Sequence, residues 1–182
     1  MPFFTSGTLI TTLQGEKPVE SLRPGDRIVT RENGLQTLRT IFRRDYDYAE
    51  LAAAPQLWPL QVMAGSLGPS QPEKDLLVGS NLRLLVDAES AVESPEGPDA
   101  LCSAKLLEDG HNVRKCAVLS VSYVHLGFDR HEIVLANGIW AESFCATDQS
   151  LGPLGTDQRR DLAEVMGSSA PNASMPAKAV GA

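Results

Sequence analysis

Short segments of alternating apolar and polar residues, separated by turn sequences, fill the first forty residues and again residues 118–144. Alternation with a period of two is typical of a strand with one buried face. Asn33-Gly34 and Asn137-Gly138 each lie between two such segments, and this dipeptide favours a tight hairpin turn. The pattern predicts an all-β chain of successive hairpins, with strands at 7–12, 17–22, 27–30, 35–42, 118–126, 131–136 and 139–144.

The rest of the chain is less regular. Further short strands are expected at 57–62, 75–78 and 83–86, and the acidic, proline-containing residues 87–99 predict an exposed excursion. Residues 103–110 are expected to form one or two helical turns. We divide the chain into a β domain at 2–148, a short helical extension at 149–167 and a disordered tail at 168–182, which has almost no bulky apolar residues.

Charge and cysteine content narrow the classes of partner and location. The chain has 16 Lys and Arg against 23 Asp and Glu, a formal net charge of −7. This balance argues against nucleic acid and anionic membranes as partners, and leaves an unknown protein partner open. The N-terminal residues contain no Sec-type signal, so we expect a cytoplasmic protein or one exported by another route. The three cysteines cannot all pair with one another and are expected to be reduced thiols.

Two blocks of sequence resemble a known family. The first is FTSGTLITT at 4–12 followed by GEKPVESLRPGDRIVT at 15–30, and the second is YVHL at 123–126 followed by FDRHEIVLANGIWAESF at 128–144. Together they resemble the N-terminal and C-terminal blocks of Hint (Hedgehog/intein) domains, closest to the bacterial stand-alone or tail-appended subgroup. The resemblance implies an all-β fold of hairpins related by pseudo-two-fold symmetry, here with a short C-terminal helix.

The resemblance also implies a chemistry of self-cleavage. In active members, a Cys or Ser at the first position attacks the preceding carbonyl group, and a His in a middle block assists at the scissile amide. An amide is a poor electrophile, so the reaction needs a nucleophile, a proton donor for the leaving nitrogen and a stabiliser of the oxyanion.

This sequence departs from the family pattern where that chemistry takes place. The nucleophile position is Phe3, and the middle block matches residues 79–83 with Leu82 at the His position. The terminal His-Asn pair of splicing inteins is missing, and only Met1-Pro2 precede Phe3. The sequence therefore predicts a degenerate Hint domain that does not process itself, and no enzyme activity is expected.

Alternatives remain open at the sequence level. Residual autoproteolytic or hydrolytic activity would use His131, assisted by Asp129, with Thr5 or Ser80 as the nucleophile. A structural tail module of a larger secreted system is a further alternative. We predict no cofactor and no metal site, because His125, His131 and Cys145 lack the tight spacing of a ligand set.

Overall fold

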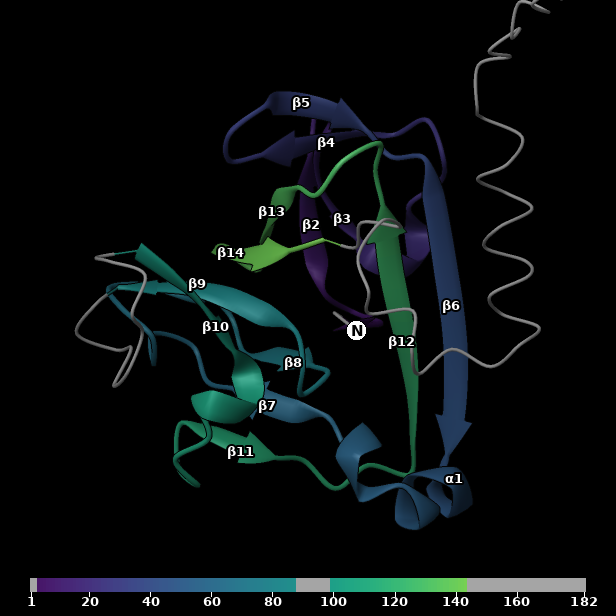
Figure 1. Ribbon diagram of the computed structural model, residues 1–182, viewed down its shortest axis with the longest axis vertical. Helices are drawn as coiled ribbons and strands as arrows, with labels where there is room; N and C mark the ends of the chain where they lie inside the picture. The colour runs from purple at the N-terminus through teal and green to yellow at the C-terminus, as the bar shows by residue number, and fades with distance from the viewer. Residues whose placement is uncertain (1–2, 88–98, 144–182) are drawn as a thin grey trace, which may run out of the picture. The chain divides into compact units, whose positions relative to one another are not determined.

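Two antiparallel sheets make up the described part of the chain, residues 3–87 and 99–143 of the computed structural model (Figure 1). Four predictions concern residues outside these ranges: most of the acidic excursion at 87–99, the helical extension at 149–167, the tail at 168–182 and the state of Cys145. Within the described ranges, the expected all-β class is confirmed.

The first sheet has six strands in the order β11-β7-β8-β1-β12-β6. Its longest pair is formed by β6 and β12, which run side by side along their full length (Figure 1). The strand bounds are β1 Phe4–Thr5, β6 Thr40–Asp47, β7 Leu60–Val62, β8 Leu76–Val78, β11 Val113–Lys115 and β12 Ser120–Gly127.

The second sheet has eight strands, with the order β10-β9-β14-β13-β2-β4-β5 and with β3 paired to β2. It joins the two ends of the described chain, because β2 and β4 from the first block pair with β13 from the last. The strand bounds are β2 Leu9–Thr12, β3 Gly15–Pro18, β4 Arg27–Thr30, β5 Gly34–Thr37, β9 Arg83–Asp87, β10 Asp99–Ser103, β13 Ile133–Ala136 and β14 Ile139–Glu142.

Both Asn-Gly hairpins form as expected. Asn33-Gly34 lies at the turn between β4 and β5, and Asn137-Gly138 connects β13 to β14. Gly34 has a φ of 62° and Gly138 a φ of 79°. A glycine adopts this left-handed conformation without the steric cost of a Cβ atom, which explains the position of each glycine.

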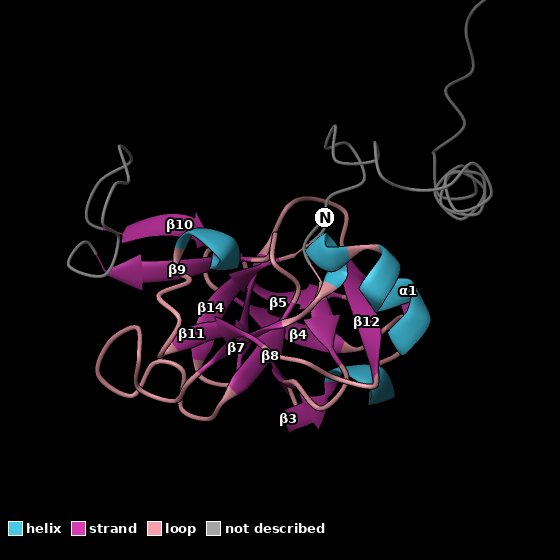
Figure 2. Cartoon of the chain, turned by 90° about the horizontal axis from the view of Figure 1, so that it is seen from below, coloured by secondary structure: helices cyan, strands magenta, loops and turns pink. Residues whose placement is uncertain are grey.

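Three local predictions are corrected by the structure. The helical turns expected at 103–110 shrink to one 3-10 turn, η3, at Ala104–Leu106. The strand expected at 17–22 is instead the end of β3 followed by a 3-10 turn, η1, at Val19–Ser21. A helix that the pattern did not predict, α1 at Tyr48–Ala53, follows β6 directly and lies near the start of β12 (Figure 2).

The helix α1 begins at a capping box. The Asp47 side chain accepts a hydrogen bond from the backbone N–H of Glu50, and the Glu50 side chain accepts one from the backbone N–H of Asp47. This reciprocal pair satisfies two donors that a helix start leaves open. A further 3-10 turn, η2 at Pro55–Leu57, follows α1. No helix among the described residues is long and apolar enough to span a bilayer.

Strand β12 separates two hydrophobic clusters. Val124 and Leu126 belong to the larger cluster, whereas Val121 and Tyr123 belong to a smaller one. Successive side chains of a strand point to opposite faces, so these two pairs lie on opposite faces of β12. The same alternation places His125 on the face of Tyr123.

Candidate functional site

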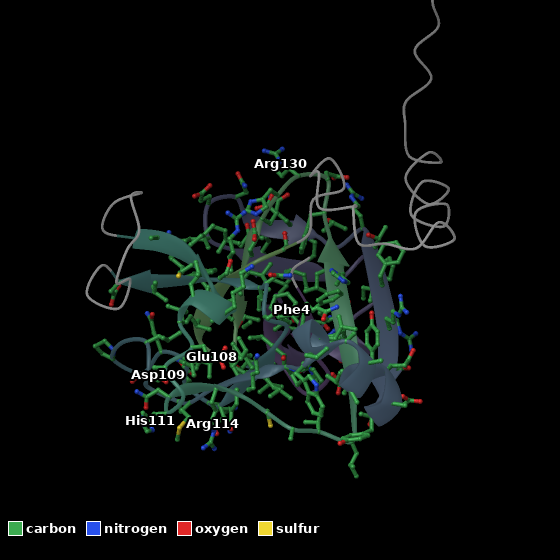
Figure 3. All side chains as sticks on the ribbon, turned by 60° about the horizontal axis from the view of Figure 1, so that its bottom comes forward. Phe4, Glu108, Asp109, His111, Arg114 and Arg130 are labelled. Atoms are coloured by element: carbon green, nitrogen blue, oxygen red, sulfur yellow. The ribbon has the colours of Figure 1, made fainter. Side chains whose placement is uncertain are left out.

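Phe3 lies directly before β1 and opposite His125. In the pairing of β1 with β12, Phe4 is opposite Val124 and Thr5 is opposite Tyr123. The Phe3 ring packs edge-on against the His125 ring, with ring centroids 4.1 Å apart, and tilted against the Tyr123 ring at 4.8 Å. Phe4 points to the other face, where it is 1% exposed within the larger cluster and lies among interior side chains in Figure 3.

Gly79 connects the two positions that the family resemblance assigns to chemistry. Its backbone N–H donates to the carbonyl oxygen of Phe3 at 3.0 Å, and its own carbonyl oxygen accepts from the N–H of Leu82, also at 3.0 Å. A Cβ atom at Gly79 would lie 2.9 Å from the Cβ of Phe3, closer than two carbon atoms can pack. The absence of a side chain at residue 79 therefore allows the β8–β9 turn to approach the first residue of the fold.

Leu82 is fully buried. It is 0% exposed and belongs to the larger hydrophobic cluster, together with Leu84 on the following strand β9. An aliphatic side chain can neither donate nor accept a proton, so this position supports packing alone.

His125 is an imidazole in a largely apolar environment. Burial is the main cause that lowers its pKa from 6.5 to about 3, because the charged form cannot be solvated there. The ring is therefore neutral at physiological pH. Its neighbour Tyr123 is also buried, which raises the pKa of the phenol above its usual value, and the phenol donates to the carbonyl oxygen of Leu57 at 2.6 Å.

The hydroxyl groups of the candidates Thr5 and Ser80 are both donors to backbone carbonyls. Thr5 Oγ1 donates to Leu77 O at 2.6 Å, which fastens β1 to β8. Ser80 Oγ donates to Gln56 O at 3.2 Å. In these contacts each hydroxyl satisfies a backbone carbonyl acceptor, which is a structural role.

The other two candidates, Asp129 and His131, have different partners. Asp129 is an exposed residue, and its carboxylate pairs with Arg39 at 2.8 Å. His131 Nε2 lies 2.5 Å from Glu142 Oε1 on β14. The four candidates thus take part in four separate contacts, with Leu77, Gln56, Arg39 and Glu142 as the respective partners.

Glu142 is the centre of a charged cluster that the sequence did not predict. Arg83 Nε donates to Glu142 Oε2 at 2.6 Å, and a second nitrogen of the same guanidinium contacts Oε1, the oxygen that His131 also approaches. Burial raises the pKa of the Glu142 carboxyl, but the hydrogen bonds from His131 and Arg83 outweigh it, so the net shift is downward. The carboxylate is therefore ionised, and it links Arg83 on β9 and His131, two residues before β13, to β14.

The importance of His125 and Glu142 could not be read from the sequence alone. Alternation along residues 118–126 places His125 on the face of Tyr123, but only the register of β1 on β12 brings Phe3 to that face. Arg83 and Glu142 are 59 residues apart, and the pairing of β9 with β14 brings them together.

Comparisons with known proteins agree with this architecture. A family model described as Hint domain matches residues 2–148. The solution structure of a bacterial intein-like domain from Clostridium thermocellum is similar, with a TM-score of 0.53 and 14% identity over 79% of this chain and 99% of that one. The crystal structure of the gp41-1 intein matches with a TM-score of 0.44 and 10% identity, covering 77% of this chain and 97% of that one. No curated protein sequence matches the chain.

Proposed function

Because the chain belongs to the Hint domain family, we propose that it is a Hint domain that keeps the fold but has lost the self-cleavage reaction, and that it persists as a folded module. The observation that carries the proposal is the packing of Phe3. The ring at the nucleophile position contacts His125 and Tyr123, where an active relative has a thiol or a hydroxyl group.

The first step of the family reaction needs a heteroatom at this position. A sulfur or oxygen atom attacks the carbonyl carbon of the preceding residue, the peptide C–N bond breaks, and the freed nitrogen takes up a proton. The phenyl ring of Phe3 has no lone pair to offer. It also excludes water from the neighbouring imidazole, whose pKa of about 3 keeps it neutral and makes it a weak base.

The second requirement is a proton donor for the leaving nitrogen. The resemblance assigns this role to residue 82, and the structure supports that assignment because Phe3 and Leu82 hydrogen-bond to the same glycine. Leu82 has no exchangeable proton on its side chain. The backbones of the two altered positions meet at Gly79, while the Phe3 ring packs against the smaller hydrophobic cluster and the Leu82 side chain lies in the larger one.

The contacts of the alternative nucleophiles favour the same interpretation. A Ser or Thr nucleophile needs a base within hydrogen-bond reach of its hydroxyl. The hydroxyls of Thr5 and Ser80 donate to backbone carbonyls, and His131 contacts the carboxylate of Glu142. A residual hydrolase that combines these groups would first have to break those contacts.

The proposal is tested with a reporter protein fused before residue 1 and incubated with and without a small thiol. We expect the fusion to stay intact under both conditions on a denaturing gel. Release of a thiol-trapped reporter would overturn the proposal, since a thiol captures only an acyl group that has already moved to a side chain. A Thr5→Val, Ser80→Ala double variant is the matched control, because it removes both alternative hydroxyls and leaves Phe3 and Leu82 in place.

A further inference from the structure

The two Asn-Gly sequences of the chain have very different surroundings. An asparagine followed by glycine is open to attack on its side-chain carbonyl by the next backbone nitrogen, because glycine has no Cβ atom to obstruct it. Both sequences form hairpin turns here, so the local sequence alone does not distinguish them. Their burial and hydrogen bonds do.

Asn137 is enclosed. It is 6% exposed, its Oδ1 accepts from the N–H of Leu9 at 2.7 Å, and its Nδ2 donates to the carbonyl of Asp75 at 3.0 Å. A Cβ atom at Gly138 would overlap with the side chain of Glu73, so the backbone of the turn is also closely covered. These contacts hold the amide and shield the following nitrogen.

Asn33 is exposed at the end of the β4–β5 hairpin, and apart from Gly34 and its two chain neighbours no atom lies within 4 Å of the place where a Cβ of Gly34 would be. One face of the Asn33 side chain nevertheless points inward. Its Nδ2 donates at 2.9 Å to Oε2 of Glu132, a residue that is only 2% exposed. An open turn and a buried carboxylate thus meet at one amide group.

We propose that Asn33 is a site of spontaneous deamidation, and that its conversion loosens the contact between the β4–β5 hairpin and the C-terminal block. The backbone nitrogen of Gly34 gives its proton to a solvent base and attacks Cγ of Asn33. The amide nitrogen takes up a proton from the protonated solvent base, the bond from Cγ to this nitrogen breaks, ammonia leaves, and a cyclic imide remains. Water then opens the ring to an aspartate or an isoaspartate at residue 33.

The product reverses the interaction with Glu132. An amide donor becomes a carboxylate, which only accepts hydrogen bonds when ionised. Two carboxylates then share a site that had one, and they repel each other unless one of them takes up a proton. A cation near Glu132 is Arg130, whose Nε lies 3.9 Å from Oε1 and whose side chain extends into solvent in Figure 3. That distance is too long for a direct hydrogen bond to compensate for the lost donor.

The effect reaches the C-terminal block through Glu132. The backbone N–H of Glu132 donates to Ser143 Oγ at 3.0 Å, and the N–H of Ser143 donates to Glu132 O at 2.8 Å. In the same region, the N–H of Arg31 donates to Ile133 O at 2.9 Å. Repulsion at Asn33 therefore acts on the segment that aligns β4 with β13.

The first test follows the modification itself. The folded chain is incubated in a weakly alkaline buffer and sampled over time. Each sample is digested, and the masses of the separated peptides are measured by mass spectrometry. We expect the peptide with Asn33 to convert several-fold faster than the peptide with Asn137, and the two rates to become similar in denaturant. Equal rates in the folded chain, or faster conversion at Asn137, would overturn the assignment of the site.

The second test follows the consequence. We expect Asn33→Asp to lower the melting temperature at neutral pH more than Asn33→Ser, which removes the donor without adding a charge. When Glu132→Gln is added to Asn33→Asp, the new amide at residue 132 can donate a hydrogen bond to the carboxylate at residue 33. This double variant should therefore recover most of the lost melting temperature. An Asn33→Asp variant with the same melting temperature as the parent protein would contradict the proposed role of Glu132. Neither test depends on whether the chain cleaves itself, so failure here leaves the proposed function untouched.

Discussion

The ring of Phe3 lies edge-on to the imidazole of His125, with 4.1 Å between the ring centroids and an angle of 63° between the planes. An edge-to-face arrangement is a favourable geometry for two aromatic groups. The contact joins Phe3, directly before β1, to β12, the neighbouring strand in the first sheet. The Phe3 ring also shields the imidazole from solvent, and through this shielding the residue at position 3 affects the protonation state of His125.

Removing the Phe3 ring should change both the free energy of unfolding and the pKa of the His125 imidazole. We expect Phe3→Ala to lower the free energy of unfolding by about 2 kcal/mol, because the ring is only partly buried. The pKa of His125 should rise from about 3 toward 6.5 as water reaches the ring. Chemical denaturation measures the first quantity and an NMR titration the second.

Phe4→Leu is the matched control for that experiment. Phe4 is the next residue, but it packs in the larger cluster on the opposite face of β12. The substitution should cost some stability and leave the pKa of His125 where it is. A Phe3→Ala protein in which the His125 pKa stays near 3 would show that Phe3 does not control the solvation of the imidazole.

The buried imidazole predicts a stability that depends on pH. The folded pKa of His125, about 3, is below its unfolded value of 6.5, so the unfolded chain binds more protons between these two values. Stability must therefore fall as the pH falls below about 6.5. The carboxyl groups with lowered pKa values act in the same direction only below their own ordinary values, which for Glu142 is 4.5.

The window between pH 6.5 and 4.5 thus reports mainly on histidines. We expect the free energy of unfolding of the parent protein to decrease through this window, and a His125→Gln variant to show a clearly smaller decrease. Urea denaturation at a series of pH values measures both slopes. Identical slopes in the two proteins would argue against a neutral, buried His125.

Glu142 should be more important for stability than its exposed partners suggest. Its carboxylate is buried, whereas the side chains of Arg83 and His131 are 42% and 37% exposed. Replacing Glu142 by Gln leaves Arg83 and His131 with a weaker partner. We expect a loss of about 2 kcal/mol, since solvent around the partners screens part of the full effect of breaking a buried pair.

A double variant distinguishes the ion pair from simple packing. Arg83→Met with Glu142→Leu replaces both charges by apolar groups, and it should be more stable than Glu142→Gln alone. Thermal melting of the three proteins provides the comparison. If the double variant is the least stable of the three, the charges themselves stabilise the β9–β14 pairing. The loss in Glu142→Gln would then not come only from leaving a charge without its partner.

The sequence predicted the local parts of the fold well. The hairpins at Asn33-Gly34 and Asn137-Gly138 form where the turn residues require them, since a turn is decided by a few adjacent positions. Helix α1 was missed although its capping residues, Asp47 and Glu50, are visible in the sequence. Its six residues are too few to show a helical period.

The site could be predicted only in part, because it depends on non-local pairing. Alternation gives the two faces of β12, and the family resemblance gives Phe3 and Leu82 as the altered positions. Neither places Phe3 over His125, which requires the register of β1 on β12. For the same reason, the cluster around Glu142 became visible only when β9, β13 and β14 were placed together.

If Phe3 and Leu82 together prevent the acyl shift, the rate of thiol-dependent reporter release should differ among four fusions. These carry the parent sequence, Phe3→Cys, Leu82→His, and both substitutions. We predict no release from the parent or from either single variant, because a thiol without a proton donor and a donor without a nucleophile are each insufficient, and release only from the double variant. Release from the parent protein, or rapid release from Phe3→Cys alone, would show that Phe3 and Leu82 do not together prevent the acyl shift.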